Sequence, residues 1–293
     1  MVLSRSDVMI RVRCPAKVNL FLKVLGRRSD AYHEVQNVMQ TIRLFDELTL
    51  RKQGTGVTLE CLRETVEGST EENLAFKAAD LFLRKGHGTG GVHLELKKNI
   101  PIAAGLGGGS SDAASCLMAL NELFRVGLSD DDLRSTAAEL GSDVPFFVEG
   151  GTALCTGRGE LVKPLPAAPR FGGILIAPDV RFKTSEMYGL LSAEDSQGPD
   201  VDVMLHSIES GELSSVCSSL FNSFERVAFQ KAPELAHLKS MLERLGSLGV
   251  ILCGSGPTLL GIFPSVAQAE AALQRFRLAT GPKTRFAAVV STF

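Results

Sequence analysis

Glycines and serines between residues 101 and 114 form the pattern in this sequence that points most directly to chemistry. The stretch reads Pro-Ile-Ala-Ala-Gly-Leu-Gly-Gly-Gly-Ser-Ser-Asp-Ala-Ala and lies between a strand-like segment and a strongly helical one. Glycines let the backbone turn tightly with its amides exposed. Ser110 and Ser111 are predicted to open the helix, whose free N–H groups and dipole favour an anion. The stretch therefore predicts a loop that binds a polyphosphate, and Ser111 is a candidate to offer its hydroxyl to a Mg²⁺ ion on that phosphate.

Three other interpretations of this stretch fit less well. A Walker loop needs a Lys after its glycines, and none follows here. A dinucleotide-binding fingerprint needs its third glycine at another position and a buried parallel strand before it. A flexible linker is disfavoured because the glycines directly adjoin a helix-forming run.

Two further segments carry candidate polar groups. Lys17 and Asn19 are two residues apart in a strand-like run, so they share one face at a spacing of about 7 Å. A cation and an amide suit a polar ligand there, although such a face taken alone is more often simply solvated. Asp143 stands in Gly-Ser-Asp-Val-Pro-Phe-Phe (141–147), where the alternative is a cap for a short helix with Pro145 in its first turn.

The elements that position these groups are predicted from the spacing of apolar residues. Residues 8–13, 17–24, 57–62 and 92–97 alternate, which predicts half-buried strands of an antiparallel or mixed sheet with one solvated face. Apolar stripes at helical spacing predict helices over 74–82, 113–124, 133–140 and 265–279. Ser129 and Asp132 should cap the third of these helices and Gly141 should close it.

A Pro-rich stretch at 164–170 marks a boundary. Beyond it we expect a strand over 172–177, helices between 184 and 245, a strand-turn-strand over 250–263 and a final strand ending near 292. The predicted fold class is α+β, in two lobes with the active site in the cleft between them. The predicted domains are residues 1–163 and 164–293.

Composition excludes several classes of protein. The 293 residues carry a net charge of −2 and no long basic run, which disfavours nucleic-acid binding. No apolar run approaches the roughly 18 residues of a membrane span. The strand-like pattern begins by Val8, so no signal peptide is expected. The six cysteines have no metal-binding spacing and suit buried thiols in a reducing compartment, so the protein is expected to be cytoplasmic, with no membrane partner.

The glycine-rich stretch resembles the Pro-x-x-x-Gly-Leu-Gly-Ser/Gly-Ser-Ser motif of GHMP kinases, whose ATP phosphates lie on such a loop. Its triple glycine followed by Ser-Ser-Asp-Ala-Ala is similar to the diphosphocytidyl-methylerythritol kinase branch of that family. The resemblance implies a GHMP-kinase-like fold and places Asn73 on the adenine side of ATP. The residues that it assigns to ATP and its phosphates are Pro101, Ala103, Ala104, Gly105, Leu106, Gly107, Gly108, Gly109, Ser110 and Ser111.

The N-terminal strand resembles the same branch. The patterns Pro-Ala-Lys-x-Asn-Leu-x-Leu from Pro15 and Arg-x-Asp-x-Tyr-His up to His33 both match, with Ala31 where the family usually has Gly. The resemblance implies that Lys17 is catalytic and Asn19 binds substrate, and that Tyr32 stacks on cytosine while His33 hydrogen-bonds its edge. An aromatic face and a two-nitrogen ring suit a pyrimidine chemically. Phe182 is expected, from its context only, to be the second aromatic beside the cytosine.

Residues 141–147 and 252–263 match two further motifs of the family. In the first, the resemblance makes Asp143 the catalytic base that accepts the proton of the substrate hydroxyl, with a neighbouring Lys17 keeping it ionised and offsetting charge on the phosphoryl group. The transition state is loose, so Asp143 is expected to position the hydroxyl as well. In the second, Gly-Ser-Gly at 254–256 lies between apolar strands, where a plain hairpin turn is the alternative. Asn222-Ser-Phe-Glu225 departs from the family's Asn-Asp-Leu-Glu and is assigned to helix packing only.

The resemblance therefore implies an ATP- and Mg²⁺-dependent kinase that phosphorylates the 2-hydroxyl of diphosphocytidyl-methylerythritol in non-mevalonate isoprenoid synthesis, as a monomer or weak homodimer. Another GHMP kinase, acting on homoserine or a mevalonate derivative, would have no reason to keep Tyr32 and His33. A GHMP-fold sensor without activity should have lost Lys17 or Asp143. An oxidoreductase would need an acidic residue at the end of a second parallel strand, and none fits.

Overall fold

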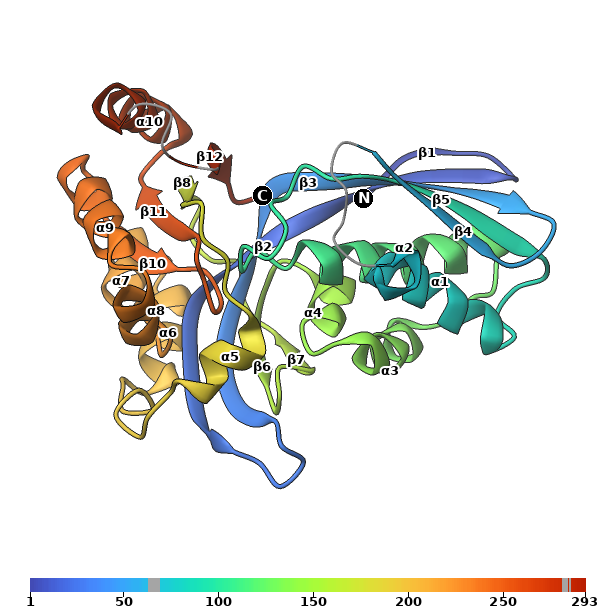
Figure 1. Cartoon of the computed structure of the whole chain (residues 1–293), viewed down its shortest axis with the longest axis horizontal. Coiled ribbons are helices and arrows are strands. Elements are labelled where there is room, and N and C mark those ends of the chain that lie inside the picture. Colours follow the sequence, from blue (N-terminus) through green and yellow to red (C-terminus); the bar gives the residue numbers. More distant parts are fainter. Residues whose placement is uncertain (63–68, 281–283, 285) are drawn as a thin grey trace. The chain divides into compact units, whose positions relative to one another are not determined.

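The computed structural model describes residues 1–62, 69–280, 284 and 286–293, which form two compact units (Figure 1). Unit 1 comprises Met1–Ala16, Leu44–Ile102 and Gly107–Gly150, and unit 2 comprises Lys17–Arg43, Ala103–Leu106 and Gly151–Phe293. Neither unit is one stretch of sequence, because the long strands β2 (Met9–Arg27) and β3 (His33–Gln53) contribute to both. The domains predicted from the sequence, residues 1–163 and 164–293, are each one continuous stretch. They stay a prediction.

In unit 1 helices line one side of a mixed sheet, as Figure 1 shows. The strand order is β1-β2-β3-β5-β4, where β3 and β5 are antiparallel and β4 and β5 are parallel. The remaining elements of this unit are β1 (Val2–Arg5), β4 (Val57–Leu62), β5 (Gly91–Lys97), the 3₁₀ turn η1 (Thr70–Glu72), α1 (Leu74–Arg84), α2 (Gly108–Phe124), α3 (Asp130–Leu140) and α4 (Val144–Glu149). The α+β fold class with mixed and antiparallel sheets is confirmed.

The local signals at the start of the chain explain part of this unit. Ile10, Val12 and Cys14 are buried in β2 while Arg11 and Arg13 are exposed, as alternation predicts. The predicted caps of α3 are also confirmed, because Ser129 and Asp132 form a capping box and Gly141 is the C-cap. The alternation and the caps depend only on residues that are close in the sequence, which is why they could be predicted from it.

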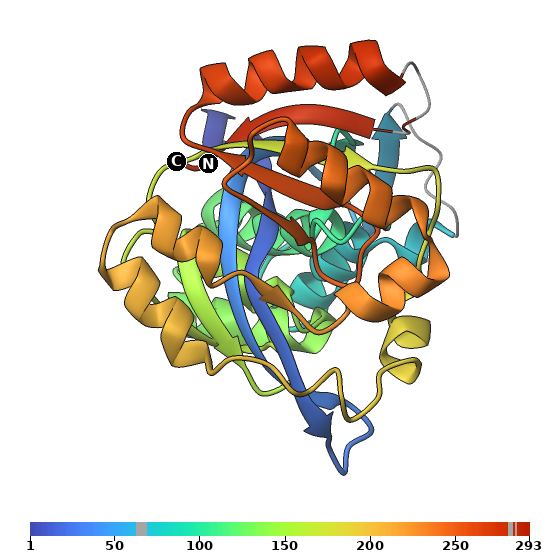
Figure 2. The ribbon, with the colours of Figure 1, turned by 90° about the vertical axis from the view of Figure 1, so that its left-hand side faces the viewer.

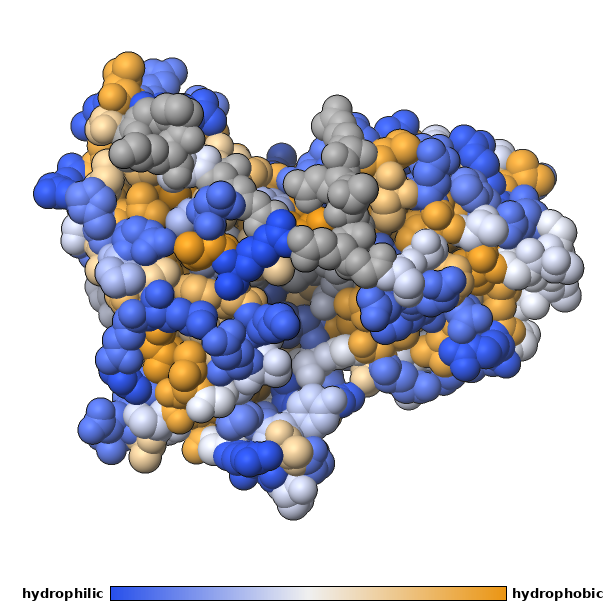
Figure 3. Space-filling view, viewed as in Figure 1, coloured by the Kyte–Doolittle hydropathy of each residue, from blue (hydrophilic) through white to orange (hydrophobic). Residues whose placement is uncertain are grey.

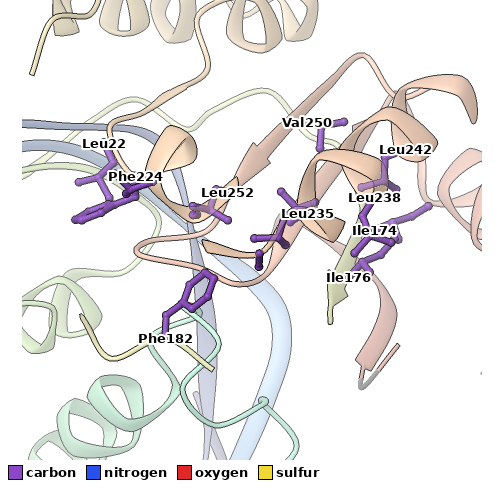
Figure 4. Close-up of a cluster of buried hydrophobic side chains, with 14 of the residues drawn as sticks. Leu22, Ile174, Ile176, Phe182, Phe224, Leu235, Leu238, Leu242, Val250 and Leu252 are labelled. Atoms are coloured by element: carbon purple, nitrogen blue, oxygen red, sulfur yellow. The ribbon is translucent and has the colours of Figure 1, made fainter. Parts of the chain in front are cut away.

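In unit 2 a second sheet has the order β10-β11-β8-β12, with antiparallel neighbours. Its strands are β8 (Gly172–Ala177), β10 (Gly249–Leu252), β11 (Leu259–Phe263) and β12 (Phe286–Ser291), and helices α9 (Glu234–Arg244) and α10 (Val266–Thr280) pack on it. Figure 2 shows α10 lying along this sheet. Side chains of β8 and α9, among them Ile174, Ile176, Leu235, Leu238 and Leu242, form one apolar cluster (Figure 4). Burying each such side chain stabilises the fold by about 1.5–3 kcal/mol.

Two further strands of unit 2 pair with those parts of β2 and β3 that belong to this unit, residues 17–43. β6 (Thr152–Thr156) pairs with β3 and with β7 (Leu161–Pro164), and β9 (Phe221–Asn222) runs parallel to β2. Side chains on both faces of β2 are buried from Ala16 to Leu22, so the solvated face predicted there is wrong. The helices between the strands are α5 (Thr184–Gly189), α6 (Val201–Glu209), α7 (Leu213–Ser218) and α8 (Glu225–Lys231).

The surface agrees with the mixed composition. Figure 3 shows hydrophilic and hydrophobic residues interspersed over α1 and α3 of unit 1. Within the part of the chain that the structure describes, no helix combines the length and the apolar character that a membrane crossing requires.

Candidate active site

Lys17 lies in a buried hydrogen-bond network of unit 2. Its Nζ donates to Asn19 Oδ1 at 2.9 Å, and the same oxygen accepts from the Gly254 N–H at 2.8 Å. Asn19 Nδ2 donates in turn to Asn37 Oδ1 at 2.8 Å. Lys17 is 3% exposed and Asn19 1% exposed, so the two do not form a solvated face. The side chain of Asn19, predicted to bind substrate, is used here to hold the ammonium of Lys17 beside residue 254.

Asn222 organises the same loop. Its Nδ2 donates to the carbonyl oxygens of Leu252 and Gly254 at 2.7 and 2.8 Å, and its Oδ1 accepts from the Phe224 N–H at 2.9 Å. A buried amide with three backbone partners fixes the conformation of that backbone. The sequence analysis gave Asn222 a role in helix packing only, which is wrong.

The middle of the glycine-rich stretch, residues 103–106, belongs to unit 2 and packs on this loop. Gly105 has a φ of +77°, and a Cβ there would lie 2.0 Å from the carbonyl oxygen of Cys253. Only glycine fits such an approach. The Lys17 N–H donates to the Leu106 carbonyl oxygen at 3.0 Å. The glycine-rich stretch and the Gly-Ser-Gly turn are therefore brought together around Lys17.

A hollow of about 440 Å³ opens in unit 2 against these loops. Hydroxyl groups of Thr184 and Ser255 lie 3.3 Å apart within its lining, to which Lys183 also contributes. Hydroxyls, a cation and glycine backbone suit an anionic group of a substrate. The lining residues are Ala103, Gly105, Phe182, Lys183, Thr184, Ser185, Ser255 and Gly256.

The end of the glycine-rich stretch belongs to unit 1 and opens α2. The helix begins at Gly108, two residues earlier than the predicted start at Ser110, and its N-cap Gly107 has a φ of +69°. The first N–H groups of an α-helix have no acceptor inside the helix. Since Gly108 and Gly109 carry no Cβ, an anion can approach these N–H groups closely.

The two serines of this helix start differ in exposure. Ser110 is half-buried, whereas Ser111 is fully buried and its Oγ has no hydrogen-bond partner among the residues that the structure describes. Buried hydroxyl groups are normally paired. An orphaned hydroxyl at the start of a glycine-rich helix fits a ligand oxygen, and Ser110 is the serine that solvent reaches more easily. Pro101, at the start of the stretch, is half-buried, and Ala104 is buried.

A buried ion cluster lies under the start of α2 in unit 1. Lys98 Nζ donates to Asp112 Oδ2 at 2.7 Å and also to Asp46, and it would lie 3.3 Å from a Cβ at Gly108. Burial raises the pKa of Asp112 to about 7 against the opposing charge of Lys98. Burial alone would lower the pKa of Lys98, but the charges of Asp112 and Asp46 raise it above its usual value. Lys98 therefore stays charged. The sequence analysis missed this cluster, because its members are far apart in the sequence.

Asp143 is the N-cap residue of α4 in unit 1. Its side chain makes no capping hydrogen bond to this helix, whose residues are all described, and Pro145 lies in the first turn as predicted. The alternative that Asp143 serves only as a helix cap is therefore wrong. The side chain is half-buried, and Val144 and Phe146 beside it are buried, which anchors the backbone on one side of the carboxylate.

Tyr32 and His33 are adjacent residues of unit 2 with different surroundings. Tyr32 is 49% exposed, and the rings of His33 and Tyr188 are stacked with centroids 4.7 Å apart and an angle of 23°. Burial and, less strongly, the charge of Arg27 lower the pKa of His33. A neutral imidazole has one donor and one acceptor nitrogen, which matches the mixed edge of a pyrimidine. Ala31 has a φ of +67°, which explains why glycine is usual before this tyrosine.

Phe182 and Asn73, predicted to contact the cytosine and the adenine, have other contacts in the structure. The ring of Phe182 is 6% exposed and belongs to the apolar cluster (Figure 4), so it offers little free surface for stacking on a base. Tyr188 is half-buried and stacked on His33, and it is the aromatic residue that the sequence analysis missed. The scarcity of tyrosine, at positions 32 and 188 only, was the available signal. Asn73 caps α1 through an Oδ1 that accepts from the Ala75 N–H at 2.9 Å.

Comparisons with known proteins place these features in a family context. Residues 73–151 match the model of the GHMP kinases N terminal domain, and residues 204–282 match the model of the GHMP kinases C terminal. Over 253 residues the chain is 43% identical to 4-diphosphocytidyl-2-C-methyl-D-erythritol kinase of Shouchella clausii (strain KSM-K16), covering 86% of this chain and 84% of that protein.

Solved structures agree with these matches. A crystal structure of 4-(cytidine 5′-diphospho)-2C-methyl-D-erythritol kinase has a TM-score of 0.81 and 35% identity, with coverage of 97% of this chain and 100% of that one. Homoserine kinase from Cytophaga hutchinsonii has a TM-score of 0.76 at 21% identity, covering 99% and 96%. At that identity the second likeness concerns the fold alone.

Proposed function

This chain belongs to the GHMP kinase family, in the branch of the 4-diphosphocytidyl-2-C-methyl-D-erythritol kinases, and we propose that it phosphorylates the 2-hydroxyl of 4-diphosphocytidyl-2-C-methyl-D-erythritol. The new bond joins the γ-phosphorus of ATP to the 2-oxygen of the substrate. The bond from that phosphorus to the β–γ bridging oxygen breaks, and ADP leaves. The step belongs to non-mevalonate isoprenoid synthesis.

Two charged residues have the chemistry that this transfer needs. Asp143 is proposed to accept the proton of the 2-hydroxyl and to orient that hydroxyl. Lys17 is proposed to offset the negative charge that develops around the transferring phosphoryl group. Its burial and its hydrogen bond to Asn19 support this role, because a fixed ammonium needs little reorganisation during the reaction.

ATP is the phosphoryl donor in this family, and the start of α2 is the proposed site of its phosphates. The glycines without Cβ and the orphaned hydroxyl of Ser111 support this placement. Mg²⁺ would neutralise phosphate charge in ATP. Among the described residues no group of three or more His, Cys, Asp or Glu side chains could hold a metal, so the ion would depend mainly on phosphate oxygens, with Ser111 as the proposed protein contact.

The proposed substrate specificity depends on a nucleobase pocket formed by Tyr32, His33 and Tyr188. The observation that supports it best is the exposed Tyr32 next in sequence to His33, which stacks on Tyr188 and whose pKa is lowered by burial. An aromatic face and a donor–acceptor ring together suit a pyrimidine. Homoserine and mevalonate derivatives have no base to occupy such a pocket, which disfavours the alternative kinases.

The substrate is tested by measuring ADP release from Mg-ATP with the purified protein. We expect turnover with 4-diphosphocytidyl-2-C-methyl-D-erythritol and none above background with homoserine or mevalonate phosphates. Turnover with one of the other alcohols alone would keep the kinase assignment and overturn the nucleobase pocket. The predicted cytoplasmic location and the monomeric or weakly dimeric state stay predictions.

Replacing Tyr188 with Leu should raise KM for the cytidine substrate about tenfold or more and leave KM for ATP unchanged. The expected size follows from base–aromatic stacking, which is worth about 1–3 kcal/mol per base. Steady-state kinetics with each substrate varied separately checks this result. Phe182→Leu is the comparison variant: Phe182 lines the hollow but its ring is 6% exposed and packs in the apolar cluster, so the change should lower thermal stability more than it changes KM. A larger KM effect at Phe182 than at Tyr188 would restore the original prediction.

A further inference from the structure

One face of the exposed Tyr32 ring is covered by an arginine that the reaction does not use. The guanidinium carbon of Arg158 lies 4.9 Å from the ring centroid of Tyr32. A guanidinium within about 6 Å of an aromatic face is attracted by the negative face of the ring. Neither Arg158 nor this contact has a role in the reaction derived so far.

The turn that carries Arg158 is fixed by its own residues. Gly157 has a φ of +70°, and a Cβ there would lie 2.7 Å from the Glu160 carboxylate. The Arg158 N–H donates to Glu160 Oε2 at 2.7 Å. Because the conformation needs glycine at 157 and an acceptor at 160, the direction in which residue 158 leaves the backbone is set locally.

The same turn is tied to the strand that follows Tyr32. The Gly157 N–H donates to Glu34 Oε1 at 3.0 Å, and the Val35 N–H donates to the Gly157 carbonyl oxygen at 2.9 Å. Glu34 also accepts from Arg28 at 2.7 Å, and the Arg28 N–H donates to the Tyr32 carbonyl oxygen at 2.7 Å. The backbone on both sides of Tyr32 is therefore held, and Arg158 lies against its side chain.

We propose that Arg158 is a positioning residue that holds the ring of Tyr32 ready to stack on the nucleobase of the substrate. The inference rests on the proposed function, because it needs a base at Tyr32. A half-exposed side chain otherwise loses rotamer freedom when a ligand orders it, and that loss weakens binding. With Arg158 on one face, the ring is already ordered and its opposite face is left for the base.

The chain offers a direct probe of this pocket. It contains no Trp and only two Tyr, and these are Tyr32 and Tyr188. Intrinsic tyrosine fluorescence therefore reports only from these two positions. Titration with cytidine and with cytidine diphosphate, in the absence of ATP, gives dissociation constants that do not depend on turnover.

The test compares Arg158→Ala and Arg158→Lys with the wild-type chain and with Lys163→Ala, which removes an exposed cation from the neighbouring strand β7. We expect Arg158→Ala to raise the dissociation constants of both cytidine and cytidine diphosphate about three- to tenfold. Arg158→Lys should recover part of this lost affinity. We expect Lys163→Ala to bind as the wild type does. KM for the cytidine substrate should rise by the same factor, with kcat and KM for ATP unchanged.

Two results would overturn the inference while leaving the proposed function in place. One is unchanged binding in Arg158→Ala. The other is a loss for cytidine diphosphate but not for cytidine, since that would show a direct contact of Arg158 with the phosphates. If the wild-type chain binds neither compound and does not turn over the cytidine substrate, the proposed function fails and the inference fails with it.

Discussion

Replacing Asp143 with Asn should lower kcat by about 10²–10⁴-fold, the usual contribution of general acid–base catalysis. The substitution exchanges one oxygen for an amide of nearly the same size. Because the Asp143 side chain makes no capping hydrogen bond to α4, replacing its carboxylate with an amide removes no such bond from the helix. The fold and the affinity for ATP should therefore be kept. Steady-state ADP release gives kcat, and equilibrium titration with ATP gives the affinity.

The size of this loss separates two roles of the carboxylate. In a loose transition state the hydroxyl proton is transferred late, so a group that mainly orients the hydroxyl contributes less than a full base. A loss near the lower end of the range would indicate orientation. Asp131→Asn is the matched control, since this carboxylate lies on α3 of the same unit with its side chain 89% exposed, and it should keep normal kcat. Near-normal kcat in Asp143→Asn would remove Asp143 from the chemistry.

Features that depend on sequence neighbours could be predicted from the sequence. The strand at 172–177 lies where the apolar run is, and Ser129, Asp132 and Gly141 cap α3 as their spacing indicates. The glycine-rich stretch was placed correctly before a helix because its composition allows few alternatives. Each of these signals acts over a few residues, which is the range that periodicity and capping rules cover.

Features that depend on tertiary burial could not be predicted in the same way. β3 has no simple alternation, because both of its faces are buried over residues 37–42. Phe182 and Tyr188 are both aromatic residues that follow β8, and only packing distinguishes the buried ring from the one stacked on His33. The roles of Asn19 and Asn222 depend on Gly254, which is more than 30 residues away in the sequence from each of them.

Among the features that depend on tertiary burial, the ion cluster of Lys98, Asp46 and Asp112 has the largest expected effect on stability. Replacing Lys98 with Met should lower the free energy of unfolding by about 3–5 kcal/mol, the usual cost of removing one partner from a buried ion pair. The carboxylates of Asp46 and Asp112 would then be buried without their cation. Lys97→Met is the matched control, because Lys97 is the adjacent residue and is 30% exposed in its pair with Glu47. Denaturant unfolding of both variants measures the difference.

The pH dependence of this loss identifies its cause. With Lys98 present, burial already raises the pKa of Asp112 to about 7, and without the cation the pKa should rise further. A carboxyl whose pKa is higher in the folded state than in the unfolded state costs stability as pH rises from its unfolded pKa through its folded pKa. The wild type and the variant lose stability in parallel up to the wild-type folded pKa of about 7. The deficit of Lys98→Met relative to the wild type should therefore grow only above that value, between about pH 7 and pH 9, and adding Asp112→Asn to that variant should reduce this growth. A stability deficit that is the same at both pH values would indicate that the packing of the lysine stem was lost. Lys98 would then stabilise the start of α2 by packing and not by its charge.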